Sequence, residues 1–355
     1  MKKLRPPSLS VRSGSEARFS CFHITLTHFS NLFTFLSMKR SIIFFLLTCL
    51  LAGITLPLRA QWTPIGADID GEATNNYSGW SVSTSADGKR VAVGAIGNNG
   101  KGHVRVYAEN NGSWSQIGAD IDGEANNDQF GYSVSLSADG KRVAIGAPTN
   151  DGSGDNAGHV RIYAENNGSW SQVGADIDGE AANNQSGLSV SISADGKRVA
   201  IGGPYNNGNG AASGHVRIYA ENNGSWSQVG NDINGEAANN TSGHFISLSA
   251  DGKRVAIGAP YNQGSFGMFA QAGHVRVYDE NNGSWTQVGA DIDGEAVNDL
   301  SGWSLSLSAD GKRVAIGAYN NDGNGNNSGH TRVYAENNGS WAQVGADIDG
   351  EAGSD

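Results

Sequence analysis

Residues 62–355 consist of one sequence unit that is repeated, and this repetition restricts the possible folds more than any other feature. The tryptophan that opens the unit recurs at intervals of 52 to 59 residues, at Trp62, Trp114, Trp170, Trp226, Trp285 and Trp341. A fixed period of this length is typical of solenoids, propellers and other repeat architectures. An active site is usually one asymmetric cluster, whereas these residues are copied, and we therefore predict that the chain is not an enzyme.

The copy at 114–169 contains the signals of four short β-strands. Asp-Gly separates SVSLS (133–137) from RVAIGA (142–147), and Asn-Gly separates HVRIYAE (159–165) from WSQVGADI (170–177). Both dipeptides favour the positive φ angles of tight hairpins. Val, Leu and Ile alternate with Ser, Ala and Gly, which gives each sheet a bulky and a thin face that can stack on its neighbours. The predicted fold is an all-β propeller of four-stranded antiparallel blades, with five complete repeats.

Short motifs in the unit resemble a known family. Phe130-Gly131 is followed by Gly146-Ala147-Pro148, and near variants return in the other copies. This pattern resembles the FG-GAP repeat, the blade unit of integrin-α-type propellers, as found in bacterial secreted or surface proteins. The family's usual Asp-x-Asn-x-Asp-Gly calcium loop is replaced here by a tight Ala-Asp-Gly-Lys turn, so we expect no calcium in that hairpin. The phrase SADGKRVAIG is also similar to blades of WD-repeat and TolB-like propellers.

The N-terminal residues lie outside the repeat. A basic region at 38–40 precedes an apolar run at 41–58, and Ala60 follows shortly afterwards. This order is typical of a secretory signal peptide cleaved near Ala60. A transmembrane anchor is the alternative, although the run is barely long enough and contains a glycine and a proline.

The sequence therefore predicts three parts and an incomplete ring. They are a mis-assigned N-terminal extension at 1–37, a signal peptide at 38–60 and a β-propeller at 61–355, whose repeats are 62–113, 114–169, 170–225, 226–284, 285–340 and a truncated 341–355. Because the last copy stops within a connector, we expect a fragment of a larger ring. A five-bladed ring with a spare strand is the rival interpretation.

Charge and cysteine content exclude several functions. The whole chain has a formal net charge of −11 at pH 7, and the part after residue 60 is more acidic because many of the basic residues precede it. Nucleic acids and anionic membranes both attract a positive surface, so neither is an expected partner. Cys21 and Cys49 both precede residue 61, which excludes disulfides and thiolate chemistry from the predicted secreted chain. We expect it to be secreted or displayed on the cell surface.

The copies differ mostly in the loops between the second and third strands. Such variation on one face is typical of a binding surface. The most distinctive loop carries Phe266, Met268 and Phe269 in an otherwise polar sequence. These residues either contact a partner or fill a local gap. With them, Asp151, Asp155 and Asp322 are the predicted ligand-binding residues.

The connector DIDGEA is the predicted metal site. Alternating Asp, Asp and Glu around a glycine offer the oxygen ligands that calcium prefers. The candidate ligands are Asp68, Asp70, Glu72, Asp120, Asp122, Glu124, Asp176, Asp178, Glu180, Asp291, Asp293 and Glu295. The alternative is a solvated acidic connector with Asx turns. No other cofactor is expected.

Histidine and tryptophan recur at fixed positions of the unit. His103, His159, His215, His274 and His330 each open a third strand. Equivalent copies diverge around a ring, whereas a zinc site needs converging ligands, so we expect these histidines to be structural. The repeated tryptophans are expected to pack between blade rims. His244 is not repeated and has no visible catalytic partners.

These features predict a binding or adhesion module that recognises an extracellular protein or glycan through its long loops and connectors. We expect no nucleic-acid partner and no membrane insertion after signal cleavage. A scaffold within a larger secreted enzyme and a passive structural array on the cell surface are the alternatives.

Overall fold

A computed structural model describes residues 63–264 and 271–354 of the chain. The predicted extension, the predicted signal peptide and Trp62 lie outside these residues. Apart from one short 3₁₀ helix, η1 (Asn98–Gly100), the regular structure in the described part is β-strand. That part contains no helix of the length and apolarity needed to span a membrane.

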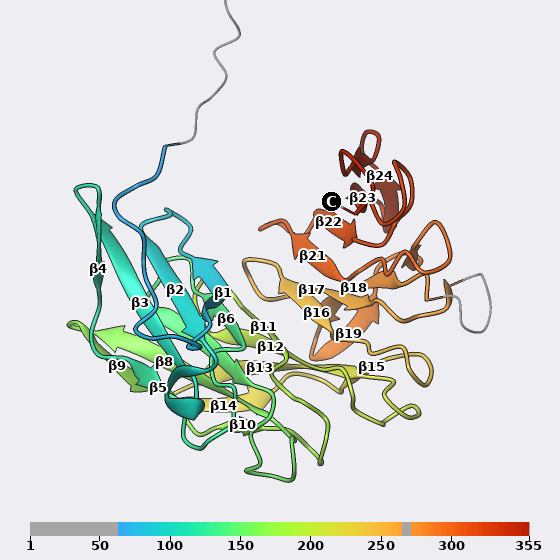
Figure 1. Ribbon diagram of the computed structural model, residues 1–355. Helices are drawn as coiled ribbons and strands as arrows, with labels where there is room; N and C mark the ends of the chain where they lie inside the picture. The colour runs from blue at the N-terminus through green and yellow to red at the C-terminus, as the bar shows by residue number, and fades with distance from the viewer. Residues whose placement is uncertain (1–62, 265–270, 355) are drawn as a thin grey trace, which may run out of the picture. The chain divides into compact units, whose positions relative to one another are not determined.

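The strands form five antiparallel sheets, which confirms the predicted all-β blade architecture (Figure 1). Each sheet takes its first three strands from one sequence repeat and its fourth and fifth strands from the start of the next. In each blade the third strand pairs with the second, with the fourth and with a short fifth strand. Blade one contains β1 (Ser78–Thr84), β2 (Arg90–Ala95), β3 (His103–Asn110), β4 (Ser113–Gln116) and β5 (Ile121–Asp122). Blade two contains β6 (Ser133–Leu136), β7 (Arg142–Ala147), β8 (His159–Asn166), β9 (Ser169–Gln172) and β10 (Ile177–Asp178). Blade three contains β11 (Ser189–Ile192), β12 (Arg198–Gly203), β13 (His215–Asn222), β14 (Ser225–Gln228) and β15 (Ile233–Asn234). Blade four contains β16 (Phe245–Leu248), β17 (Arg254–Ala259), β18 (His274–Asn281), β19 (Ser284–Gln287) and β20 (Ile292–Asp293). Blade five contains β21 (Ser304–Leu307), β22 (Arg313–Ala318), β23 (His330–Asn337), β24 (Ser340–Gln343) and β25 (Ile348–Asp349).

The first strands of the blades lie side by side. β1 contacts β6, β6 contacts β11, β11 contacts β16 and β16 contacts β21. The first strands are therefore the inner strands of the propeller, and the fourth and fifth strands form the outer edges of the sheets (Figure 1). The hairpin turns that contain Asp-Gly and Asn-Gly lie at one end of each sheet. The long second-to-third loops and the connectors lie at the other end.

The outer strand differs from the prediction. The sequence suggested one continuous strand over 170–177, but β9 pairs with the end of β8 and β10 pairs with its beginning, and the segment between them is not a strand. Gly174, in that segment, adopts a φ of +75°, which is outside the range of an extended strand. The interruption places the start of the acidic connector next to the first residues of β8.

The hydrophobic core lies between the blades. Val199 and Ile201 of β12 pack against Val160 and Ile162 of β8, together with Ala144 of β7. Equivalent clusters join the other successive blades. The faces are less simple than the predicted bulky and thin sides, because the small Ala144 lies beside the large Ile162 on the same face. Each interface therefore combines large and small side chains from different strands.

Glycine allows successive blades to approach closely at the inner strands. A Cβ added to Gly146 of β7 would lie 2.0 Å from the carbonyl oxygen of Gly187, which precedes β11 of the next blade. Ser133 Oγ of β6 donates a hydrogen bond of 2.8 Å to the same oxygen. Gly202 and Gly243 repeat this contact one blade further on. The close approach explains why the unit needs both a Gly-Ala-Pro segment and an Xaa-Gly pair.

Hydrogen bonds also join the blades at their rims. The indole nitrogen of Trp170 donates to the carbonyl oxygen of Ile117 at 2.9 Å, and the tryptophans of the other four described fourth strands make the equivalent bond. At the short-turn end, the amide of Ala138 donates to the carbonyl oxygen of Ala194 at 2.9 Å. The predicted packing of tryptophan between blade rims is confirmed.

Gly146→Ala tests the importance of the close approach. We expect a loss of about 3 kcal/mol or more in the free energy of unfolding, because the new methyl group would displace backbone of the next blade. Gly168→Ala is the matched control: no heavy atom lies within 4 Å of its Cβ position, and its φ of +80° costs only about 1 to 2 kcal/mol of strain. Urea denaturation of both variants provides the comparison. An equal or smaller loss in Gly146→Ala would contradict this role.

Candidate functional site

One variable position brings large side chains to the inner strands at the long-loop end of the blades. It directly follows the glycine of the Xaa-Gly pair and is occupied in turn by Trp80, Tyr132, Leu188, His244 and Trp303. Each lies just before or at the start of a first strand, and the amide of Trp303 donates to the carbonyl oxygen of Leu300 at 3.1 Å. The turn therefore holds this position at the same place in every blade, while the side chain differs.

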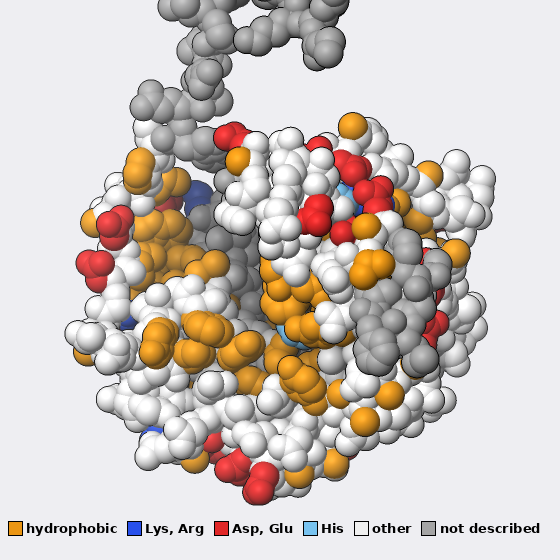
Figure 2. All heavy atoms as spheres, turned by 45° about the vertical axis from the view of Figure 1, so that its right-hand side comes forward, with side chains coloured by type: hydrophobic (Ala, Val, Ile, Leu, Met, Phe, Trp, Pro, Cys, Tyr) orange, Lys and Arg blue, Asp and Glu red, His pale blue; other side chains and the backbone are white. Residues whose placement is uncertain are grey.

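Four of the aromatic side chains in blades four and five form a cluster. The rings of His244 and Trp303 have centroids 4.8 Å apart, and Tyr261 lies 6.3 Å from His244 and 6.2 Å from Trp303. Tyr319 packs 4.9 Å from Trp303 and is 48% exposed. We call His244, Tyr261, Trp303 and Tyr319 the aromatic cluster. Figure 2 shows hydrophobic side chains gathered around the middle of this face, with a histidine among them.

A pocket of about 420 Å³ lies next to the aromatic cluster. Tyr205 and Tyr261 supply aromatic surface, and Asn239 and Gln263 supply amide groups. Aromatic faces beside hydrogen-bonding amides suit a ligand with both apolar and polar surfaces, such as a sugar ring.

Burial determines the charge of His244. Removal from water lowers the pKa of this imidazole from its ordinary value of 6.5 to about 4. The cause is the cost of placing a positive charge among aromatic rings without a compensating carboxylate. His244 is therefore neutral at pH 7.

A second group of side chains recurs once in each blade, near the outer strands at the same end. It combines a glutamate, a buried histidine and an aspartate, and within each group one ligand atom of every residue lies within 4.8 Å of the others. The groups are Glu72–His103–Asp120, Glu124–His159–Asp176, Glu180–His215–Asp232, Glu236–His274–Asp291 and Glu295–His330–Asp347. We call them the Glu–His–Asp clusters, numbered by blade.

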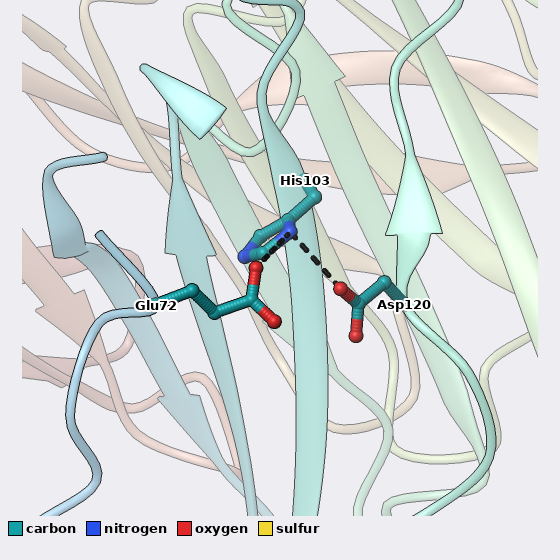
Figure 3. A group of neighbouring side chains, drawn as sticks. All are labelled: Glu72, His103 and Asp120. Carbon is teal, nitrogen blue, oxygen red and sulfur yellow. Dashed lines mark ion pairs between the residues drawn. The ribbon is translucent and has the colours of Figure 1, made fainter. Parts of the chain in front are cut away.

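Figure 3 shows the first cluster. His103 Nδ1 lies 3.3 Å from Asp120 Oδ2 and 4.0 Å from Glu72 Oε2. The pKa of His103 is lowered, because burial outweighs the attraction of Asp120. A neutral imidazole beside two carboxylates is a donor set that could hold a metal ion.

Each connector contributes to two clusters. Asp120 belongs to the cluster of its own blade, whereas Glu124, four positions later, reaches His159 of the next blade. The pairing of β5 with the start of β3 places Asp120 beside His103, and the following turn directs Glu124 onward. The clusters therefore form a continuous series that links successive blades.

An arginine accompanies every cluster. In cluster three, Arg217 lies 3.6 Å from Glu180 Oε1 and donates to the carbonyl oxygen of Asp178 at 2.7 Å. Arg161 in cluster two behaves differently, because its guanidinium donates to both carboxylate oxygens of Asp176 and also contacts Glu124. Burial raises the pKa of Asp176, but the hydrogen bonds from Arg161 and Gln172 outweigh it and lower that pKa overall.

The structure brings together about half of the predicted metal ligands. It places Glu72, Asp120, Glu124, Asp176, Glu180, Asp291 and Glu295 in clusters. Asp68, Asp70, Asp122, Asp178 and Asp293 belong to none of the clusters found in the described residues. Repeated groups that could hold a metal ion are compatible with the predicted calcium, although they include a nitrogen donor that the prediction lacked.

Sequence reasoning missed the five strand-opening histidines, because it considered only whether they converge on one another. They converge on the acidic connectors instead. A constant spacing was available as a signal: each histidine is followed after 17 residues by the aspartate of its cluster, as in His103 and Asp120. The metal ligands predicted from the sequence also lacked Asp232, Glu236 and Asp347, which complete clusters three, four and five.

The predicted ligand-binding residues have different positions. Phe266, Met268 and Phe269 lie outside the described residues. Asp151 is exposed and its Oδ1 accepts a hydrogen bond of 2.7 Å from the amide of Asn156, which orders its own loop. The remaining two, Asp155 and Asp322, are likewise exposed in long loops. Their role in binding stays a prediction.

Protein comparisons identify the repeat and the fold. Residues 119–163 match the model of the FG-GAP repeat. None of the curated proteins has a matching sequence. A putative 6-phosphogluconolactonase from Bacteroides uniformis is similar in structure, with a TM-score of 0.53 and 15% identity over 76% of this chain and 71% of its own. The periplasmic gluconolactonase of Pseudomonas aeruginosa has a TM-score of 0.48 and is 18% identical, over 77% of this chain and 70% of its own.

The first of these structures corrects one prediction. We predicted that the chain is not an enzyme because its residues are repeated, and this was wrong: a protein of the same fold is named as a putative 6-phosphogluconolactonase. A propeller can place one asymmetric site on a repeated frame, because loops and inner positions differ between blades. At 15% identity the similarity establishes the fold, and the activity in that name belongs to that protein.

His244→Leu tests the environment of the aromatic cluster. In the unfolded chain His244 binds a proton near pH 6.5, whereas in the folded chain it does so only near pH 4. The contribution of His244 to the free energy of unfolding is therefore constant above pH 6.5 and becomes less favourable as the pH decreases towards 4. We expect the wild type to lose about 2 to 3 kcal/mol more than the variant over this range. Leu188 already occupies the equivalent position of blade three, so the leucine is compatible with the turn. Urea denaturation at several pH values measures the difference, and parallel profiles would contradict a buried, neutral His244.

Proposed function

Since the chain carries an FG-GAP repeat in a β-propeller, we propose that it is a secreted or cell-surface binding module that recognises an extracellular glycan or protein. Recognition uses the face formed by the long loops and the inner-strand turns. The main support is the aromatic cluster with its adjoining pocket, at positions that differ between copies. The signal-like segment at 38–60 supports export.

The structural arrangement favours a glycan over a flat protein epitope. Tyr205 and Tyr261 present aromatic surface, and Asn239 and Gln263 present amides beside it. Sugar rings combine apolar C–H faces with hydroxyl groups, and such a pocket complements both. The acidic chain makes nucleic acid and anionic membranes unsuitable partners.

Variation around the inner strands supports recognition by more than one blade. Trp80 and Tyr132 form a second aromatic pair, with centroids 5.4 Å apart, in blades one and two. Because blade interfaces hold the backbone of these positions constant, side chains can change without disturbing the fold. An extended ligand would thus contact several blades at once.

Calcium at the connectors stays a prediction. Asp68 and Asp70 are exposed, as calcium ligands of a surface site would be, and hard oxygen donors are abundant at this end of the blades. A calcium requirement for ligand binding would be seen as a loss of binding on addition of a chelator that is restored by Ca²⁺.

Trp303→Leu tests the binding face. We expect the affinity for a glycan from an immobilised panel to fall by at least about tenfold, because aromatic anchors contribute strongly to binding. The melting temperature should change little, since leucine stands at the equivalent position of blade three.

Lys253→Ala is the control for Trp303→Leu, because this residue lies in the Asp-Gly turn at the opposite end of blade four. It should leave glycan binding unchanged. Equal affinities of the wild type and Trp303→Leu for every bound glycan would refute the proposed face. If the chain captured a protein but no glycan, the ligand would be a protein and the proposed glycan recognition would be refuted.

A further inference from the structure

We propose that the Glu–His–Asp clusters are binding sites for a divalent transition metal of the zinc type, which links successive blades. This inference is independent of the proposed glycan recognition. It concerns the outer strands and connectors, whereas the aromatic cluster lies at the inner strands.

The donor atoms converge at distances that suit a small ion. In cluster three, His215 Nδ1 lies 3.3 Å from Asp232 Oδ2 and 3.7 Å from Glu180 Oε2. Ligands about 2.0 to 2.1 Å from a tetrahedral zinc ion are separated by about 3.3 to 3.5 Å. The distance from His215 Nδ1 to Asp232 Oδ2 already has this length, and the distance to Glu180 Oε2 exceeds it slightly. Glu180 is 43% exposed and can adjust its side chain.

Several histidines have an unsatisfied nitrogen at the centre of their cluster. The side chains of His103, His215 and His330 are each 1% exposed, and their Nδ1 atoms make no hydrogen bond of acceptable geometry. Buried polar atoms almost always have a partner. An ion between the imidazole and the two carboxylates would give this nitrogen a partner.

The outer oxygens of both carboxylates are already held. Gln228 Nε2 donates to Asp232 Oδ1 at 2.7 Å, and Arg217 lies 3.6 Å from Glu180 Oε1. The oxygens that face His215 are the other two, Oδ2 and Oε2. Glu180 Oε2 also accepts a long hydrogen bond of 3.4 Å from Asn206 Nδ2, and a carboxylate oxygen has a second lone pair for an ion. Outer contacts that orient ligands in this way are typical of metal centres. The glutamine contact recurs in the other four clusters.

The donor set favours zinc over calcium. Calcium takes six to eight oxygen ligands, whereas each cluster supplies two carboxylates and one imidazole. Imidazole nitrogen favours zinc and related transition metals, and three protein ligands leave a position for water. The exposed glutamate provides the path by which an ion enters.

Cluster two differs in its charge. Arg161 Nε and Nη2 donate to the two oxygens of Asp176, at 3.0 and 2.8 Å, and the guanidinium also contacts Glu124. This positive group occupies the place of the cation. We therefore expect metal binding in clusters one, three, four and five.

Titration of the metal-free full chain with Zn²⁺ alone tests the proposal. We expect about four bound ions per chain by calorimetry, a higher melting temperature, and visible absorption bands of low-coordinate geometry when Co²⁺ replaces Zn²⁺. Glu180→Gln should lower the stoichiometry by one. It changes an exposed residue, and folding is checked by circular dichroism.

Asp178→Asn is the matched control, because it removes the same charge from the same connector at a residue outside the cluster. It should leave the stoichiometry unchanged. No Zn²⁺ binding, equal stoichiometries of the wild type and Glu180→Gln, or stabilisation by Ca²⁺ but not Zn²⁺ would each overturn the proposal. A fifth bound ion would support the metal sites and overturn the exclusion of cluster two by Arg161.

Discussion

The close approach of neighbouring blades at glycine is the constraint on which the other features depend. Gly146 allows the backbone around Gly187 to lie directly against β7, and the same contact recurs between the other blades. A side chain at this position would separate the inner strands. The hydrophobic interfaces, the tryptophan hydrogen bonds and the alignment of the connectors all require that separation to stay small. The motif thus specifies a distance between blades rather than a chemical activity.

The repeated frame could be predicted from the sequence because its signals are local. Asp-Gly and Asn-Gly turns fixed the hairpins, and the alternation of side chains fixed the strands between them. The break between β9 and β10 was missed, since Gly174 was interpreted as part of a strand. Its φ is +75°, and Gly224 and Trp226 of the next blade lie so close that they leave little room for a side chain there. Local patterns therefore predicted pairing within a blade better than contacts between blades.

The candidate sites were harder to predict, because they depend on contacts between repeats. Asp120 and Glu124 are close in sequence but serve different clusters. The histidines were interpreted as structural because their copies diverge, although each one meets an acidic pair of its own. The aromatic cluster was missed for the opposite reason: Trp303 and His244 occupy the same repeat position but are different residues. The sequence was interpreted as copies of one consensus repeat, so the difference in side chain at this position was overlooked.

The blade interfaces are nearly interchangeable, and this has a consequence for how such a gene can change. Because every blade presents the same contacts to its neighbours, an unequal recombination that duplicates or deletes a whole repeat creates no new interface that selection must repair. The connector divides its acids between two clusters, so an inserted unit would also bring a complete set of ligands. Lineages could therefore vary in repeat number rapidly, while substitutions at a few loop and inner-strand positions diversify what each copy contacts. The same equivalence allows incorrect docking between blades during folding, which the order of synthesis would help to prevent.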